Sequence, residues 1–208
     1  FVRENKPQEV EYQSAIINGK TIQFPNQVFI GGEFVATTST VDCVSPVDET
    51  VICKLHMAGE EEVERAVQAG NAAFPKWRDM NARSRGELLY KLGALMEEHA
   101  EQLALLEAYD SGAVLSLAKK THVGMSIQAF KYYAGLTDKI SGSTLPINHA
   151  KPDFNTCFTV KEPFGTVGII IPWNYPLMML AWKTSAALCA GNCVVIKPAT
   201  VTPLTALY

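Results

Sequence analysis

The stretch "GTVGIIIPWNYPLMMLAWKTSAALCAGNCVVIKP", residues 165–198, decides the fold class of this chain. Its start, "GTVGIIIP", is a continuous apolar run rich in β-branched residues, typical of a strand buried on both faces of a parallel sheet. An apolar helix is predicted over about Leu177–Ala190, and Gly191-Asn192 would close it with a left-handed cap. A second buried strand, "CVVIKP", follows. The order strand, helix, strand predicts two parallel strands joined by a right-handed crossover, and therefore an α/β fold.

The chain upstream of this unit divides into three segments. Residues 1–23 are polar and irregular and are predicted to be a linker. Residues 24–140 are predicted to form the first part of a domain, with a hairpin at Gly31-Gly32, a helix that starts behind Gly59, a long helix over about 82–110 and a third over roughly 114–139. Residues 141–162 contain two extended runs, 144–148 and 155–161, around a turn with a proline at 150–153, which indicates a projecting β-ribbon. Such a ribbon either covers its own domain or buries its open edges against another subunit.

Residues 163–208 form the second part of the domain, and this part is predicted to be incomplete. Thr202-Pro203 resembles the start of a helix, with threonine as cap and proline at the first helical position, but only Leu204–Tyr208 follow. Two parallel strands are also few for a stable sheet. The chain has no initiator methionine either, so we expect a piece of a longer protein.

The composition excludes several classes of function. The 208 residues are 48% hydrophobic and 19% charged with a net charge of −3, which is ordinary for a globular domain and disfavours nucleic-acid binding. No apolar run is long enough to span a membrane. The five cysteines are scattered, odd in number and without histidines at metal-ligand spacing, so we expect reduced thiols and no metal site.

The candidate site lies at the carboxyl ends of the two buried strands, where open α/β sheets bind their ligands. Pro172, Trp173 and Asn174 follow the first strand, and Lys197 ends the second. The Asn174 amide could donate to a developing oxyanion, but asparagine is equally a good helix N-cap. Lys197 suits a phosphate or a ribose hydroxyl, or is a surface lysine that ends a strand. No G-x-G-x-x-G fingerprint is present.

The segments "PFGTVGIIIPWNYPLMMLAWK" and "GNCVVIKPATVTPLTAL" resemble the cofactor-binding part of the aldehyde dehydrogenase superfamily, over roughly Gln27–Leu207. Within it, "DSGAVLSLAKKTHVGMSIQAFKYYAGLTDKISGSTLPIN" is most similar to the 10-formyltetrahydrofolate dehydrogenase subfamily. The resemblance implies the N-terminal part of an aldehyde dehydrogenase-like cofactor-binding domain, an oligomerisation arm at 141–162 and a linker at 1–23 from an upstream carrier domain.

The resemblance also implies a reaction and its site residues. The reaction would be NADP-dependent oxidation of 10-formyltetrahydrofolate to tetrahydrofolate and CO2 through a thiohemiacetal. Asn174 matches the oxyanion-hole donor, Lys183 a lysine near the proton path, and Met179 and Trp182 the wall of the aldehyde tunnel. The positions that match cofactor-binding residues are Ile170, Ile171, Pro172, Trp173, Lys197, Pro198, Ala199 and Thr200. The family's nucleophilic cysteine and general-base glutamate would lie beyond residue 208, so we expect the chain alone to be inactive.

Thr200 bears on the choice of cofactor. Relatives that prefer NAD carry a glutamate at this position, which would repel a 2′-phosphate, whereas a neutral threonine would not. We therefore predict that NADP is accepted, with NAD as the alternative.

The resemblance further implies the partners and the location. They are a small aldehyde or a formyl-folate, a phosphopantetheine arm on the upstream domain, and a homotetramer. A cytoplasmic location is predicted, with a mitochondrial form as the alternative. The remaining alternatives are a general NAD(P)-dependent aldehyde dehydrogenase, or a truncated chain that oligomerises or binds nucleotide without catalysis.

Overall fold

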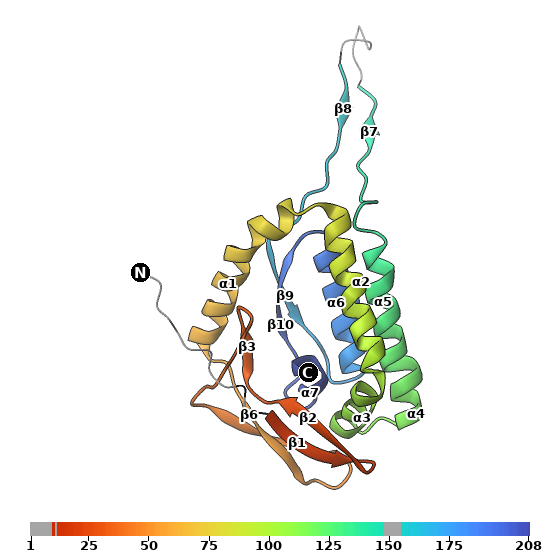
Figure 1. Cartoon of the computed structure of the whole chain (residues 1–208). Helices are drawn as coiled ribbons and strands as arrows, with labels where there is room; N and C mark the ends of the chain where they lie inside the picture. The colour runs from red at the N-terminus through yellow and green to blue at the C-terminus, as the bar shows by residue number, and fades with distance from the viewer. Residues whose placement is uncertain (1–9, 11, 148–154) are drawn as a thin grey trace.

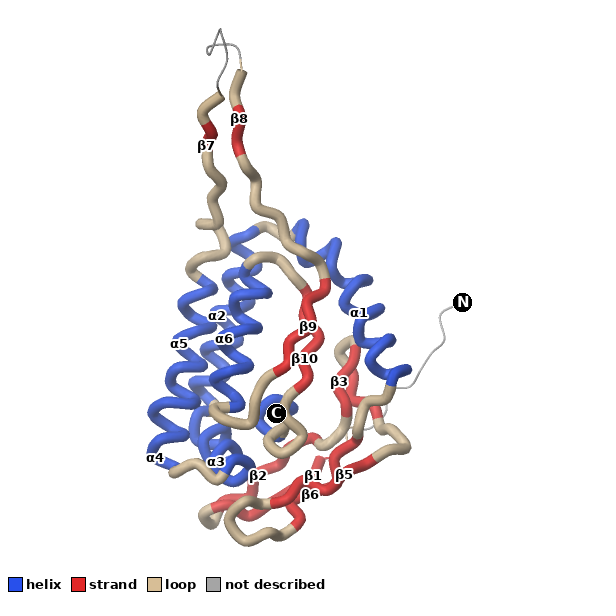
Figure 2. The backbone as a smooth tube through the Cα atoms, turned by 180° about the vertical axis from the view of Figure 1, so that it is seen from behind, coloured by secondary structure: helices blue, strands red, loops and turns tan. Residues whose placement is uncertain are grey.

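The computed structural model describes residue 10, residues 12–147 and residues 155–208. It has the predicted α/β fold. A central pair of parallel strands lies between helix α1 on one side and helices α2, α5 and α6 on the other (Figure 1). Strands β1, β2, β5 and β6 lie at one end of this body, strand β3 lies beside helix α1, and a thin ribbon projects from the opposite end (Figure 2).

The order strand, helix, strand predicted for residues 165–198 is confirmed, but the prediction of strands buried on both faces is wrong, because most residues of both strands are half-buried or exposed in this chain. Strand β9 (Thr166–Ile170) leads through helix α6 (Pro176–Cys189) to strand β10 (Cys193–Lys197), and the two strands are parallel with Ile170 opposite Lys197. Gly191, just after the helix, has a φ of +90°, which is the left-handed turn predicted there. Local patterns in the sequence are therefore sufficient to specify this unit.

Three antiparallel hairpins precede the helices. They pair β1 (Tyr12–Ile17) with β2 (Lys20–Pro25), β3 (Val28–Ile30) with β4 (Glu33–Val35), and β5 (Thr40–Val44) with β6 (Val51–His56). The hairpin predicted at Gly31-Gly32 is confirmed, and both glycines have positive φ. The prediction of an irregular linker over residues 1–23 is wrong for its part from Tyr12 onward, because β1 and β2 lie there. Asn18 and Gly19, both with positive φ, form the two-residue turn that an Asn-Gly pair favours.

The helices depart from prediction in two places. Helix α1 (Glu60–Asp79) starts behind Gly59 as expected, but the single helix predicted over 82–110 is wrong: it divides at His99 into α2 (Ala82–Glu98) and α3 (Ala100–Ser111). The third helix, predicted over 114–139, ends earlier and is not uniformly α-helical. It consists of α4 (Leu115–Leu117), a π-helical turn η1 (Ala118–Val123) and α5 (Gly124–Ala134). A short helix, α7 (Leu204–Leu207), begins one residue later than predicted, so its cap position is held by Pro203 and not by Thr202.

The ribbon consists of β7 (Thr144–Leu145) and β8 (Cys157–Phe158), which pair antiparallel with Thr144 opposite Phe158. It projects away from the body (Figure 1). Its regular strands are shorter than the predicted runs, and the turn predicted at 150–153 lies outside the described residues. The side chains of Phe158 and Val160 are exposed, so the body of this chain does not cover them.

Helix α3 stands between two hydrophobic cores. One core packs α2, α5 and α6 together through side chains that include Leu89, Met96, Leu103, Val123, Ile127, Phe130 and Leu177. The other joins the hairpins to α3 and α7 through Phe24, Cys43, Cys53, Leu55, Leu106 and Leu204. Helix α3 supplies Leu103 to the first core and Leu106 to the second. Full burial of each such side chain stabilises the fold by about 1.5–3 kcal/mol, so α3 couples the two halves of the molecule.

The contact of α2 with α5 generates a first prediction. A Cβ added at Gly86 would lie 2.6 Å from the carbonyl oxygen of Ala134 and 2.7 Å from Thr137 Oγ1, so the two helices would have to separate. We expect Gly86→Ala to lower the free energy of unfolding by about 1–3 kcal/mol, the usual range for overpacking. The measurement is thermal unfolding of the complete gene product.

Gly124 provides the matched control. It also lies in a helix, but a Cβ there would meet nothing closer than 3.6 Å. Gly124→Ala should leave stability unchanged or raise it by roughly 0.5–1 kcal/mol. If the Gly86 variant were as stable as the Gly124 variant, the close packing described for α2 and α5 would be wrong.

Candidate active site

Two loops meet at the carboxyl ends of β9 and β10. The Ile171 amide donates to the Lys197 carbonyl at 3.1 Å, which extends the strand pairing by one residue beyond β9. The Thr202 hydroxyl donates to the Trp173 carbonyl at 3.5 Å and joins the two loops directly. The structure therefore brings the predicted residues 170–174 and 197–200 to one edge of the sheet.

Asn174 lies in the first of these loops, and it is not the cap of helix α6. The N-cap is Tyr175, which has φ 52° and ψ 50°, and its own side chain makes no capping hydrogen bond. The cap interpretation of Asn174 is therefore wrong. Its side chain is exposed and has no hydrogen-bond partner within the described part of the chain. Its two N–H donors are thus available to a ligand.

The predicted cofactor residues present a mixed surface. Ile170 and Trp173 are 76% and 64% exposed, so both offer apolar area that a flat ring could cover. Ile171 is 2% exposed and can contribute only its backbone. Lys197 is exposed, with its Nζ donating to the Pro198 carbonyl at 3.1 Å. Pro198, Ala199 and Thr200 are half-buried beside it.

The edge carries a lysine and no carboxylate. Neither 170–174 nor 197–203 contains aspartate or glutamate. A phosphate would meet a cation and backbone there rather than like charge, so the residues fit a phosphorylated nucleotide.

The remaining predicted residues lie along α6. Trp182 lines an open, mainly apolar groove of about 460 Å³ together with Met125, Gln128, Ala129, Tyr132 and Tyr133 of α5. Met179 is half-buried and is not part of that lining. Lys183 is exposed, roughly 10 Å along the helix axis from Pro176, so the structure does not bring it to the strand ends. The α5 side of the groove was missed from the sequence; the signal was Met125 and Tyr132, two apolar residues seven positions apart.

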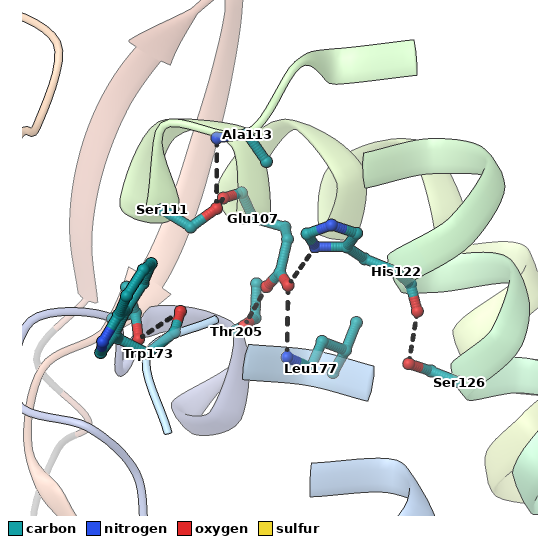
Figure 3. A network of polar contacts seen from close by, with 9 residues as sticks. Glu107, Ser111, Ala113, His122, Ser126, Trp173, Leu177 and Thr205 are labelled. Atoms are coloured by element: carbon teal, nitrogen blue, oxygen red, sulfur yellow. Dashed lines mark hydrogen bonds and ion pairs between the residues drawn. The ribbon is translucent and has the colours of Figure 1, made fainter. Parts of the chain in front are cut away.

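A buried polar network lies beneath the two loops, and sequence reasoning missed it entirely. Glu107 of α3 is fully buried. Its carboxyl group is 2.8 Å from His122 Nδ1, accepts from the Thr205 hydroxyl at 2.7 Å and accepts from the Leu177 amide at 3.3 Å. Figure 3 shows these three groups converging on one carboxyl from η1, α7 and α6. The available signal was an acidic residue inside the apolar run "LALLEAYD".

Asp110, one turn further along α3, makes the equivalent contact with α7. Its carboxyl group accepts from the Leu204 amide at 2.8 Å and from the Cys43 thiol at 3.5 Å. Burial, together with the nearby charge of Glu107, raises the pKa of Asp110 to about 7, although the two hydrogen bonds oppose the rise. Asp110 therefore changes charge near neutral pH.

Four of the five cysteines are small buried side chains. Cys43, Cys53, Cys189 and Cys193 are buried, and Cys157 is half-buried. Burial raises the pKa of the Cys189 and Cys193 thiols, which favours their protonated form. Cys193 begins β10, at the end of the strand opposite to Lys197.

The described residues, 10, 12–147 and 155–208, lack two kinds of feature. They contain no group of three or more histidine, cysteine, aspartate or glutamate side chains that could hold a metal ion. They also contain no helix with the length and apolar character that a membrane crossing requires.

The fold and the composition of this edge define the class as an α/β domain with its ligand site at the ends of parallel strands. The particular family follows from comparison with known proteins. Residues 34–208 match the aldehyde dehydrogenase family, and the chain belongs to this family of oxidoreductases.

The chain is similar to curated relatives and to solved structures. It is 56% identical over 202 residues to cytosolic 10-formyltetrahydrofolate dehydrogenase of Xenopus tropicalis, and 56% identical over 202 residues to the mitochondrial 10-formyltetrahydrofolate dehydrogenase of Mus musculus. Each match covers 95% of this chain and 22% of the relative, so the chain spans about a fifth of their length. An NAD+ complex of aldehyde dehydrogenase from Bacillus cereus matches with a TM-score of 0.83 and 42% identity, over 88% of this chain and 37% of that one.

The raised pKa of Asp110 generates a second prediction. The folded state holds the proton up to about pH 7, whereas an unfolded aspartate loses it near pH 4. The stability that this proton contributes is therefore complete below pH 4 and is lost as the pH rises through 7. Relative to Asp110→Asn, the unmodified protein should lose on the order of 2 kcal/mol between pH 5 and pH 8. The measurement is urea unfolding of the complete gene product and the variant at several pH values.

Asp138 provides the control for this titration. Lys139 holds the pKa of Asp138 below its ordinary value, so this carboxyl is ionised throughout the range from pH 5 to pH 8. Asp138→Asn should differ from the unmodified protein by the same amount at every pH. A difference for Asp110→Asn that is equally flat would contradict the prediction.

Proposed function

We propose that this chain is part of the cofactor-binding domain of an NADP-dependent aldehyde dehydrogenase that oxidises the formyl group of 10-formyltetrahydrofolate to CO2 and releases tetrahydrofolate. One observation carries the proposal: the Asn174 amide, at the strand ends that also carry Lys197, has no hydrogen-bond partner among the described residues, and neither loop there contains an aspartate or glutamate. The 10-formyltetrahydrofolate dehydrogenases among its relatives support the choice of substrate.

Different residues at the carboxyl ends of β9 and β10 would bind different parts of the nucleotide. Lys197 would bind the adenosine ribose or its 2′-phosphate, and Thr200 would leave room for that phosphate without repelling it. Ile170 and Trp173 would cover apolar ring surfaces, and Ile171, Pro172, Pro198 and Ala199 would supply backbone to the wall. When bound, the nicotinamide supplies the hydride acceptor. NAD remains the alternative cofactor, and the Bacillus cereus relative was solved as an NAD+ complex.

Asn174 would stabilise negative charge in the reaction. When a thiolate adds to the formyl or aldehyde carbon, the C=O π bond breaks and its electron pair moves to oxygen. An amide N–H aimed at that oxygen stabilises the alkoxide more than the neutral carbonyl, and such donors contribute about 10²–10³ in kcat. The cysteine that supplies the thiolate and the glutamate that activates water for thioester hydrolysis are expected outside residues 1–208.

The residues of α6 would serve the substrate side. Trp182 would form an apolar wall for the incoming carbonyl compound, with Met179 next to it on the helix and Lys183 near the path by which protons leave. The groove beside Trp182 is mainly apolar, which favours a small apolar aldehyde as a second candidate substrate. A general aldehyde dehydrogenase is therefore the alternative function.

The wider assembly follows from the same proposal. The ribbon, with its exposed Phe158 and Val160, would pair with other subunits in a homotetramer. Residues upstream would link to a carrier domain whose phosphopantetheine arm delivers the formyl group. Both cytosolic and mitochondrial relatives exist, and we propose the cytosol for this protein.

Substitution of Asn174 tests the proposed oxyanion role. In the complete gene product, Asn174→Ala should lower kcat for 10-formyltetrahydrofolate and for propanal by about 10²–10³-fold, because the donor is lost where charge develops. The dissociation constant for NADP should change less than about twofold, since the amide does not contact the nucleotide phosphate. Asn174→Asp keeps the shape but removes the N–H groups, and it should be as inactive as alanine. Unchanged kcat in both variants would contradict the proposal.

Substitution of Thr200 tests the choice of cofactor. A glutamate about 4 Å from a phosphate costs about 1 kcal/mol in water and about 4 kcal/mol near a protein surface. Thr200→Glu should therefore weaken NADP binding tenfold or more while NAD binding is kept or improved, as measured by fluorescence titration. Thr200→Gln is the neutral control of equal size. If it weakened NADP binding as much as glutamate, charge would not be the cause.

A further inference from the structure

We infer that Glu107, together with His122, is a positioning pair for the Asn174 amide. The inference rests on the proposed function and adds to it a residue that lies outside the site and acts through Asn174. The reason is geometric: the buried carboxyl of Glu107 supports the turn directly after Asn174 at two points, the Leu177 amide and, through His122, the Tyr175 ring.

The turn needs such support because its backbone is strained and its amide is unsupported. Tyr175 adopts the left-handed region with φ 52°, which is a strained conformation for a residue other than glycine. Asn174, the residue before it, has no hydrogen-bond partner within the described part of the chain. The direction of the Asn174 amide therefore depends on the position of the backbone at Tyr175 and its neighbours. A strained conformation of this kind persists only when surrounding contacts enforce it.

The first hold acts on the backbone after the turn. Glu107 accepts from the Leu177 amide at 3.3 Å, and this amide belongs to the first turn of α6. Amides at a helix N-terminus have no partner within their own helix, and a carboxyl group there also complements the helix dipole. Glu107 thus performs from α3 the capping that Asn174 does not perform locally, which leaves the Asn174 amide unused by the fold.

The second hold acts on the Tyr175 side chain. The ring of His122 lies 4.5 Å from the ring of Tyr175, centroid to centroid. His122 Nδ1 lies 2.8 Å from the same oxygen, Glu107 Oε1, that accepts from Leu177. Figure 3 shows one oxygen of the Glu107 carboxyl joined to both the Leu177 amide and the His122 ring. That oxygen therefore connects the backbone after Tyr175 with the ring packed on Tyr175.

The base of this arrangement is rigid. Glu107 and His122 are both buried, and they come from different elements, α3 and the π-helical turn η1. The Thr205 hydroxyl binds the other carboxyl oxygen, Oε2, at 2.7 Å and so fixes the rotation of the carboxyl group. Departures from regular α-helix such as η1 are frequent at functional sites, and this one carries the histidine of the pair.

Asp110 makes the inference specific, because it is a similar buried carboxyl that binds the amide of a different helix. It lies on the same helix, is equally buried and accepts from a helix N-terminal amide, but that amide belongs to Leu204 of α7. A general loss of stability should follow from changing either carboxyl. A loss of Asn174 function should follow only from changing Glu107.

The test is a double-mutant cycle in the complete gene product. Glu107→Gln keeps the size of the side chain and an acceptor oxygen but loses one of the two equivalent oxygens. We expect it to lower kcat about tenfold while KM for NADP changes less than about twofold, the pattern of an interaction made in the transition state. In the Asn174→Ala background, Glu107→Gln should lower kcat by less than about twofold, because the group it positions is gone. Asp110→Asn should have the same factor in both backgrounds.

The outcomes separate the inference from the function on which it rests. If Asn174→Ala lowers kcat but Glu107→Gln does not, or lowers it equally in both backgrounds, the positioning role is wrong and the proposed function stands. If Asn174→Ala leaves kcat unchanged, the proposed function fails, and the inference fails with it. Should Glu107→Gln not fold, His122→Gln enters the same cycle, since it removes the ring from Tyr175 but keeps a polar group facing Glu107. The same loss of kcat in both backgrounds would overturn the inference there too.

Discussion

Two carboxyl groups on one turn of α3 hold the two loops of the candidate site. A buried carboxyl is costly unless it is hydrogen bonded, and the first amides of a helix lack partners inside that helix. In this molecule the buried carboxyls accept hydrogen bonds from these helix amides. Glu107 binds an amide at the start of α6, and Asp110 binds an amide at the start of α7. Because α3 also packs into both hydrophobic cores, these contacts fix the two loops relative to the whole body.

The sheet and the helix contribute different things to the site. The pairing of β9 with β10 places Ile170 opposite Lys197 and so determines that both loops leave from one edge. It does not determine how the loops turn. That depends on where α6 and α7 begin, and the carboxyls of α3 hold those positions, while the hydrogen bond between Thr202 and Trp173 ties the loops to each other. A parallel strand pair alone would thus leave the direction of the Asn174 amide open.

The parts of this structure that local patterns determine could be predicted from the sequence, and the rest could not. The strand–helix–strand unit follows from a β-branched run, an apolar helix and a glycine cap within 34 residues. The hairpin with the turn at Asn18-Gly19 was predictable in principle, but the polar residues around it outweighed the turn signal. The break at His99, the π-helical turn and the Glu107 network depend on contacts such as that between Glu107 and Thr205, 98 residues apart. Local periodicity in the sequence does not predict contacts of that kind. For the same reason the groove beside Trp182 could not be predicted, because its other wall comes from α5.

Asn174 shows why the candidate site itself was ambiguous in the sequence. An asparagine before a helix is an excellent cap when its own backbone is extended and the helix starts at the next residue. Here Tyr175 occupies the cap position in a left-handed conformation, and a carboxyl from another helix satisfies the amide that a cap would have bound. The local rule is broken at one point, at a cost in backbone strain, and the Asn174 amide at the edge of the sheet is left without a partner among the described residues. Rules of local structure are expected to fail where function requires a group to stay free, so the departure at Tyr175 is itself an argument that Asn174 serves a ligand and not the fold.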